Sequence, residues 1–156
     1  MFGFSSTAHA QVTAFKQTLA EASARDADIA AFYRSNGFEP VWTGSSDAHA
    51  KRRQSLITAL ETATQHGLPD ATDNVTKLVT LMRDARTERD LARLEVHFSS
   101  VMLSHARAAQ TGVLVPSRVD SGIVRQVPYR DRAGYLMKFS SSDPVEFFAS
   151  LPPSSH

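Results

Sequence analysis

Apolar residues recur every three or four positions along most of this chain, and short polar stretches interrupt the pattern. Such spacing places the apolar side chains on one face of a helix. The pattern predicts amphipathic helices over residues 12–25, 75–86, 87–112, 130–139 and 144–151. It predicts two more between residues 25 and 67: one is capped by Asp26 or Asp28 and ends before Gly37, and the other begins at one of residues 45–47 and ends before Gly67. We therefore expect an all-α fold, an irregular bundle of six to seven helices.

The longest predicted helix, residues 87–112, carries one continuous stripe of inward-facing positions. The stripe comprises Leu91, Leu94, Phe98, Val101, Met102, His105 and Ala109. Its length predicts that this helix lies at the centre of the bundle, with Phe98 in the core. The start of the helix resembles a capping box, in which Asp90 takes the place of the usual glutamate opposite Thr87.

A loop rich in aromatic residues joins the second and third predicted helices. Gly37 provides the left-handed conformation that ends the second helix, and Pro40 prevents the chain from continuing as a helix. We expect Phe38, Val41 and Trp42 to be extended in this loop.

Four aromatic residues gather around the loop: Phe32, Tyr33, Phe38 and Trp42. If their rings were exposed, they would form a stacking platform for sugar rings. If buried, they would form a small aromatic core that locks the loop onto the helices. Their inward spacings favour the buried arrangement.

His66 and Gly67 end the third predicted helix, with a histidine in its last turn and a glycine just beyond it. The position of His66 is explained by the helix dipole alone. We therefore assign His66 a structural role in preference to metal binding or acid/base chemistry.

Helical spacing is lost after Gly112. Pro116, Gly122 and Pro128 interrupt the run of residues 113–128, which contains several valines. This composition predicts a short strand or an irregular arm.

The composition is that of an ordinary soluble domain. A chain of 156 residues fits one domain with a core that needs no metal or disulfide. Its formal net charge of +1 gives no reason to expect nucleic acid or an anionic membrane as a partner. No apolar run approaches the ~18 residues of a membrane-spanning helix, so we expect no membrane insertion. The densest basic cluster, residues 51–53, is interpreted as a solvated helix face.

Histidine spacing does not support a metal site. His97 and His105 are eight residues apart, or about 12 Å along a helix, so they cannot share one ion. The chain has no cysteine, and no other group has the spacing of metal ligands. We expect neither a metal nor a cofactor.

Two acidic residues, Glu61 and Glu95, lie in the middle of predicted helices. Glycoside cleavage needs two carboxyl groups that face one cleft, and nothing in the sequence pairs these two. We expect Glu95 to form an ion pair with Arg89, Arg93 or a neighbouring helix. The sequence therefore identifies no catalytic residue.

Several short motifs occur in an order that is typical of one family. The segment Ile29–Trp42 ends in Phe-x-Pro-x-Trp and precedes His66-Gly-Leu-Pro69. The run Leu91-x-x-Leu-Glu-Val96 precedes Gly112-x-x-x-Pro116. Over residues 15–153 the chain resembles the helical scaffold domain of the large, multi-domain L,D-transpeptidases.

This resemblance implies a periplasmic protein involved in peptidoglycan cross-linking and cell-wall biogenesis. In that family the reaction takes place in a separate catalytic domain whose nucleophile is a cysteine. Because this chain has no cysteine, the resemblance implies a non-catalytic scaffold whose partner is the catalytic domain. Without that partner, apolar faces around residues 113–127 and Phe147–Phe148 should be partly exposed.

Two further partners are considered. Peptidoglycan itself is a candidate ligand of the scaffold. The alternative to a scaffold is a self-contained helical module that binds a cell-wall glycan or a protein through the region of Trp42.

The ends of the chain are expected to lie outside the domain. Residues 8–10 have the small-x-small pattern of a signal-peptide cleavage site, but a basic n-region and an apolar h-region are missing before them. We interpret residues 1–10 as a disordered leader or the remnant of a signal peptide. Residues 11–153 are expected to form the helical domain, and residues 154–156 a tail.

Overall fold

The fold is all-α, as the sequence pattern predicts. A computed structural model describes residues 14–65, 70–111 and 132–151, and no strand occurs among them. The predicted arm, the leader and the tail lie outside the described residues, as do His66, Gly67, Gly112 and Pro116. The helices are residues 14–23, α2 (Ala27–Ser35), α3 (Asp47–Gln65), α4 (Asp70–Asp84), α5 (Glu88–Thr111), α6 (Arg132–Ser140) and α7 (Pro144–Ala149).

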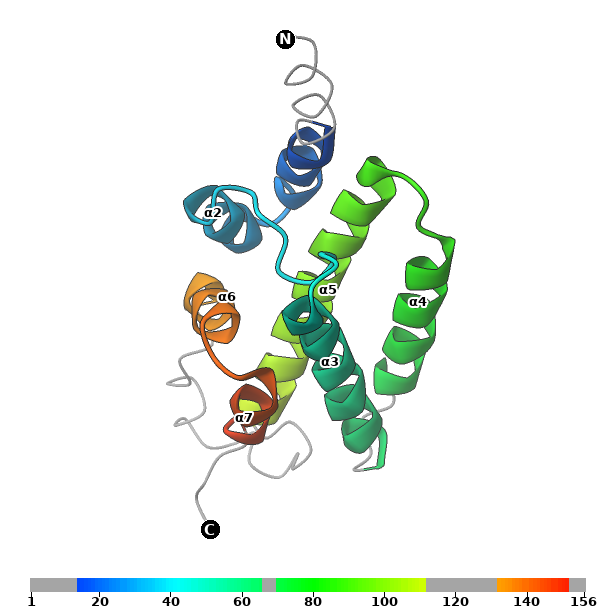
Figure 1. The fold of residues 1–156 in the computed structure, drawn as a ribbon. Coiled ribbons are helices and arrows are strands. Elements are labelled where there is room, and N and C mark those ends of the chain that lie inside the picture. The colour runs from blue at the N-terminus through cyan, green and yellow to red at the C-terminus, as the bar shows by residue number, and fades with distance from the viewer. Residues whose placement is uncertain (1–13, 66–69, 112–131, 152–156) are drawn as a thin grey trace, which may run out of the picture.

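The longest helix, α5, runs through the middle of the bundle (Figure 1). It contacts α2, α3, α4 and α6, while α3 also packs against α4 and α7. Leu94, Phe98, Val101 and Met102 of its predicted stripe are buried. The sequence therefore located the central helix correctly.

The start of α5 has the predicted capping box. The Thr87 hydroxyl accepts a hydrogen bond from the Asp90 amide at 3.0 Å, and the Asp90 carboxylate accepts one from the Thr87 amide at 3.2 Å. This reciprocal pair satisfies two amide groups that a helix start would leave without partners. Aspartate thus serves in the position usually held by glutamate.

Helices α2 and α6 lie side by side and point in the same direction. Arg132 in the first turn of α6 donates two hydrogen bonds to Asp26, the N-cap of α2, and one to Asp28, all between 2.8 and 2.9 Å. The Arg132 guanidinium holds the pKa of Asp26 below its usual value. A partly buried ion pair therefore joins the two N-terminal ends.

The loop after α2 begins with a left-handed turn that differs from the prediction at Phe38. Gly37 has the expected positive φ of +68°, but Phe38 also has a positive φ, +57°, and is not extended. The Phe38 amide donates to the Tyr33 carbonyl at 2.8 Å and the Gly37 amide donates to the Arg34 carbonyl at 3.3 Å. These two bonds form a Schellman motif, which holds Phe38 in a conformation that large side chains rarely adopt.

Helix α4 begins at Asp70, five residues before the predicted start at residue 75. The residues between were assigned to a turn because they are mostly polar. Negative charges are favourable in the first turn of a helix, and here Asp73 lies in the first four residues of α4.

The expected exposure of Phe147 and Phe148 is wrong. Their exposed fractions are 4% and 9%, and both rings contact Phe139, with centroids 5.2 and 5.5 Å away. Helix α7 therefore buries its aromatic face within this chain. The other expected exposed face, residues 113–127, lies outside the described residues.

Trp42 is the centre of the aromatic packing. Its ring stacks between Phe98 of α5, at a centroid distance of 5.1 Å, and Phe139 of α6, at 4.7 Å. Its exposed fraction is 0%. The stack therefore joins the loop after α2 to two helices that are distant in sequence.

We predict that Trp42→Ala lowers the free energy of unfolding by about 3–5 kcal/mol, because the substitution leaves a large cavity between two rings. Denaturant unfolding followed by circular dichroism measures the change. Val145→Ala is the matched control: Val145 is 56% exposed, so its loss should change stability by less than ~0.5 kcal/mol. Equal effects of the two substitutions would contradict the central role of Trp42.

Candidate functional site

The predicted aromatic residues come together in the interior. Tyr33, Trp42 and Phe98 are fully buried, Phe32 is 2% exposed, and Phe38 is half-buried against the core. A ring without exposed surface cannot stack on a sugar. This geometry therefore favours the interpretation of these residues as an aromatic core.

A carboxylate that lies among these rings organises the loop. Glu95 of α5 is completely buried and accepts hydrogen bonds from the Val41 amide at 2.7 Å, the Trp42 amide at 3.1 Å and the Thr43 amide at 3.0 Å. The Thr43 hydroxyl donates to it at 2.9 Å. Three successive amide groups form a concave anion-binding site, which here binds a side chain of the same protein.

Three further polar groups complete the cluster. The Tyr33 hydroxyl donates to Glu95 and lies 2.8 Å from the Ser99 hydroxyl, which in turn accepts the Trp42 indole N–H at 2.9 Å. We call Tyr33, Trp42, Glu95 and Ser99 the buried polar cluster. Together with the amide groups of residues 41–43 and the Thr43 hydroxyl, its members satisfy one another, so the Glu95 carboxylate lies in the core without an unpaired oxygen.

The expected ion pair of Glu95 does not occur among the described residues. Arg93 lies 3.7 Å from Asp90, and Arg89 donates to the Thr18 hydroxyl at 3.1 Å. Both arginines are exposed, whereas Glu95 points to the opposite side of α5. Backbone amide groups and hydroxyls replace the arginine as partners of Glu95.

Two arginines hold the carbonyl groups of the same loop. Arg52 donates to the Val41 carbonyl at 3.0 Å, and Arg53 donates to the Trp42 carbonyl at 2.6 Å. Arg52 also reaches the Ser140 carbonyl at 3.2 Å, at the end of α6. The interpretation of residues 51–53 as a solvated face is therefore wrong for both arginines and fits only Lys51, whose side chain is 56% exposed.

His49, in the first turn of α3, contacts both ends of the segment of residues 40–46. Its Nδ1 lies 2.6 Å from the Ser46 hydroxyl, and its Nε2 lies 3.2 Å from the Pro40 carbonyl oxygen. A Cβ atom on Gly44 would lie 2.4 Å from this imidazole ring. Gly44 is therefore required for the ring to pack across the loop.

Burial and the neighbouring carboxylate change the acidity of Tyr33. Desolvation, followed by the negative charge of Glu95, raises the pKa of Tyr33 well above its usual value of 10.0. Tyr33 therefore remains a neutral hydrogen-bond donor over the whole physiological range.

Helix α5 carries two histidines, His97 and His105. Burial lowers the pKa of His97 and of His105, so both favour the neutral form. No group of three potential metal ligands occurs in the described part of the chain. Within the same residues, no helix is long and apolar enough to cross a membrane.

Comparison with known proteins gives one family. The family model described as "Scaffold domain" matches residues 27–156, most of the chain. This chain is a member of the Scaffold domain family. No curated protein and no solved structure matches the chain significantly.

The scaffold domain has no cysteine and buries Glu95 and Ser99 completely in its core. The matched region begins with the first residue of α2 and includes the complete buried polar cluster. Both observations are consistent with a non-catalytic scaffold role. The side chains that could take part in a reaction, such as Glu95, Tyr33 and Ser99, form hydrogen bonds that stabilise the fold.

The sequence analysis missed the role of Glu95 in this scaffold domain. One signal was present, because an acidic residue stands next to Leu94 within an apolar helix face. An acid in such a position is almost never buried without a partner. Most of its partners are amide groups of the backbone, which every residue type possesses, so the residue types along the chain do not identify them.

We predict that Glu95→Gln lowers the free energy of unfolding by roughly 2–3 kcal/mol, although the side chain keeps its shape. The new amide group would face the amide donors of residues 41–43 and leave at least one of them without an acceptor. Denaturant unfolding, together with hydrogen exchange of the Val41, Trp42 and Thr43 amides, measures the change. The exposed Glu61→Gln is the matched control, and the same loss there would contradict the proposed role of Glu95.

Alkaline pH should destabilise the scaffold domain through Tyr33. Its folded pKa is raised, so the stability that it contributes is complete below the unfolded pKa of 10.0 and is lost as the pH rises toward the folded value. Unfolding experiments across this range should show a fall in stability above pH 10. Tyr33→Phe should remove this part of the pH dependence, and an unchanged profile in that variant would contradict the assignment.

Proposed function

We propose that this chain is the non-catalytic scaffold domain of a periplasmic L,D-transpeptidase involved in peptidoglycan cross-linking. The match to the Scaffold domain family over residues 27–156 carries the proposal. The order of the motifs in Ile29–Trp42 and Leu91–Val96 supports the connection with transpeptidases. A separate domain with a catalytic cysteine would perform the reaction.

The internal structure suits a protein that holds a partner in place. The loop of residues 40–44 is bonded through its amide groups to α5 and through its carbonyl groups to α3. Fully satisfied polar networks make the elements that they join more rigid. Such rigidity would preserve the geometry between a catalytic domain and its substrate.

The alternative function, a glycan-binding module centred on Trp42, receives less support. The indole ring is enclosed by Phe98 and Phe139 and has no exposed surface. A peptidoglycan-binding surface elsewhere on the chain would also fit a role in cell-wall biogenesis. The experiment below therefore includes peptidoglycan as a separate ligand.

The purified chain should be mixed with peptidoglycan and with a cysteine-bearing L,D-transpeptidase catalytic domain from the same genome. We expect tight association with the catalytic domain and cross-link formation that exceeds that of the domain alone. Replacing the catalytic cysteine by serine should abolish cross-linking and preserve association. Retention on peptidoglycan without the catalytic domain would support a wall-binding module, and indifference to both would contradict the proposal.

Two surface variants can locate the contact. Val79 of α4 and Val145 of α7 are exposed apolar residues, with exposed fractions of 43% and 56%. Serine at either position should leave the fold intact because few contacts are lost. Loss of association in only one variant would identify the helix that faces the catalytic domain.

A further inference from the structure

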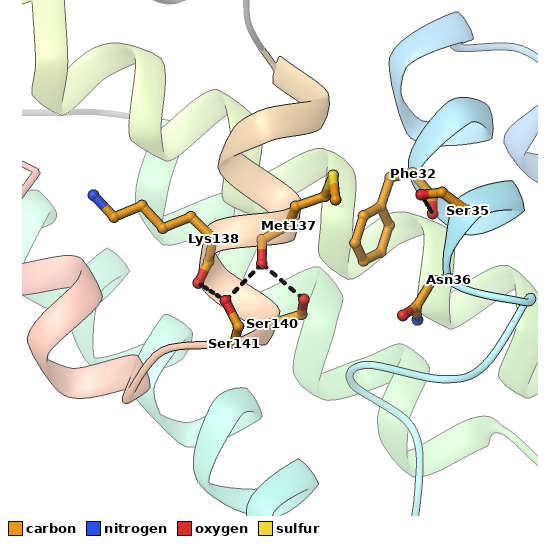
Figure 2. Close-up of a pocket in the computed structure, with 7 residues that line it drawn as sticks. All are labelled: Phe32, Ser35, Asn36, Met137, Lys138, Ser140 and Ser141. Carbon is orange, nitrogen blue, oxygen red and sulfur yellow. Dashed lines mark hydrogen bonds between the residues drawn. The ribbon is translucent and has the colours of Figure 1, made fainter.

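The last helix, α7, is the shortest of the described helices and follows α6 after a link of residues 141–143. The hydroxyls of Ser140 and Ser141 donate to the Met137 carbonyl at 2.9 and 3.1 Å (Figure 2). These side chains satisfy carbonyl groups at the end of α6 that a helix end leaves without partners. The hydrogen bonds that end α6 therefore do not depend on α7.

Helix α7 meets the central helix α5 at a histidine. The His105 ring lies at 69° to the Phe148 ring, with the centroids 5.7 Å apart. The Nδ1 atom of His105 is buried and has no hydrogen-bond partner among the described residues. Further along α5, the Gln110 side chain donates to the Leu151 carbonyl, just beyond α7. An imidazole ring therefore lies in the contact between α5 and α7.

This contact suits only the neutral form of His105. A neutral imidazole carries a proton on one nitrogen, so Nδ1 can lie among apolar groups as an unprotonated atom. The protonated ring carries a proton on both nitrogens and a full positive charge. An N–H group without an acceptor and a charge without water are both costly inside a protein. Protonation of His105 therefore opposes the docking of α7.

The charged side chains of the surrounding helices do not offset this cost. The exposed ones are Asp47 and Glu61 of α3, Arg107 of α5, Lys138 of α6 and Glu146 of α7. Other ionisable side chains of these helices, namely His49, Arg52, Arg53 and Arg132, already bind other groups. Burial lowers the pKa of His105, and no charged partner among the described residues contributes to that shift.

The N-cap of α7 remains ionised at mildly acidic pH. Asp143 accepts a hydrogen bond from the Glu146 amide at 3.0 Å and pairs with Lys51 at 2.9 Å. The bond from Lys51, followed by that from the Glu146 amide, lowers the pKa of Asp143 below its usual value of 3.8. A change in α7 at about pH 5.5–7.5 therefore does not come from this cap.

We propose that protonation of His105 at mildly acidic pH releases α7 from the bundle and uncovers the apolar face that Phe147 and Phe148 form. In the released state the imidazolium ring is hydrated, and both of its N–H groups donate to water. This inference depends only on the contact between α5 and α7, so failure of the transpeptidase experiment would leave it unaffected.

The direction of the pH dependence follows from the lowered pKa of His105. The released ring titrates near the usual value of 6.5 and so binds a proton more tightly than the docked ring. The contribution of the contact to stability is therefore complete above pH 6.5. It is lost as the pH falls toward the pKa of the docked ring.

The test is hydrogen exchange of the full chain at about pH 5.5–7.5, followed by NMR and corrected for the intrinsic pH dependence of exchange. The amides of Phe147, Ser150 and Leu151 report on α7. Their protection should fall below pH 6.5 by up to about tenfold per pH unit, the limit for uptake of one proton. The amides of Ala30 and Asn36 report on α2 and should keep their protection.

Three results would overturn the proposal. The first is constant protection of α7 over this pH range. The second is protection that rises on acidification, because the protonated ring would then remain docked in a cation–π contact with Phe148. The third is an equal loss of protection in α2, which would indicate unfolding of the whole domain and not release of one helix.

Two histidine variants assign the effect. His105→Gln carries no charge at any of these pH values, so the protection of α7 should become independent of pH. His97→Gln is the matched control: His97 lies on the same helix, its Nε2 atom is also buried without a partner among the described residues, and burial and Lys77 lower its pKa. This variant should keep the full pH dependence of α7. The reverse pattern would assign the effect to His97 and contradict the proposal.

A measurement on the unchanged chain keeps the test decisive if His105→Gln fails to fold. The ring signals of His105 give the pKa of the docked ring by NMR titration. The loss of protection in α7 should begin near pH 6.5 and level off at that pKa. A loss that begins only below it would come from another group and would overturn the proposal.

Discussion

The carboxylate of Glu95 and the three amide groups of residues 41–43 form the contact on which the rest of this structure depends. A buried carboxylate is costly unless each oxygen has partners, and here both oxygens are fully bonded. The contact brings Trp42 between Phe98 and Phe139. The aromatic core is thus assembled around a polar centre.

The loop of residues 40–44 is held from two directions. Its amide groups bind to α5, whereas its carbonyl groups bind to Arg52 and Arg53 of α3. Loops usually satisfy these groups with water and lie on the surface. Because side chains replace the water, this loop can lie inside the bundle and act as part of the core.

This arrangement bears on function as well as stability. The residues that would be natural candidates for chemistry, Glu95, Tyr33 and Ser99, are enclosed and occupied with one another. The proposed scaffold function therefore depends on surfaces, namely the exposed helix faces. An interior whose polar groups are bonded to one another suits a scaffold.

The sequence by itself determined the all-α class, the central helix and most helix ends. These features depend on short-range signals, such as the Thr87–Asp90 capping box and Gly37 after α2, which act within one or two helical turns. The sequence also placed Phe98 in the core, because the apolar stripe of α5 has helical spacing. The start of α4 was placed too late because polar residues in a first turn resemble those of a loop.

Only the tertiary structure decided the role of Glu95 and of the arginines at positions 52 and 53. The donors that bind Glu95 lie 52 to 62 positions away in the sequence, and most are backbone groups that every residue possesses. The contact between His105 of α5 and Phe148 of α7 likewise joins helices that are not adjacent in the sequence. Residue type cannot reveal such contacts, because they exist only after the helices have packed.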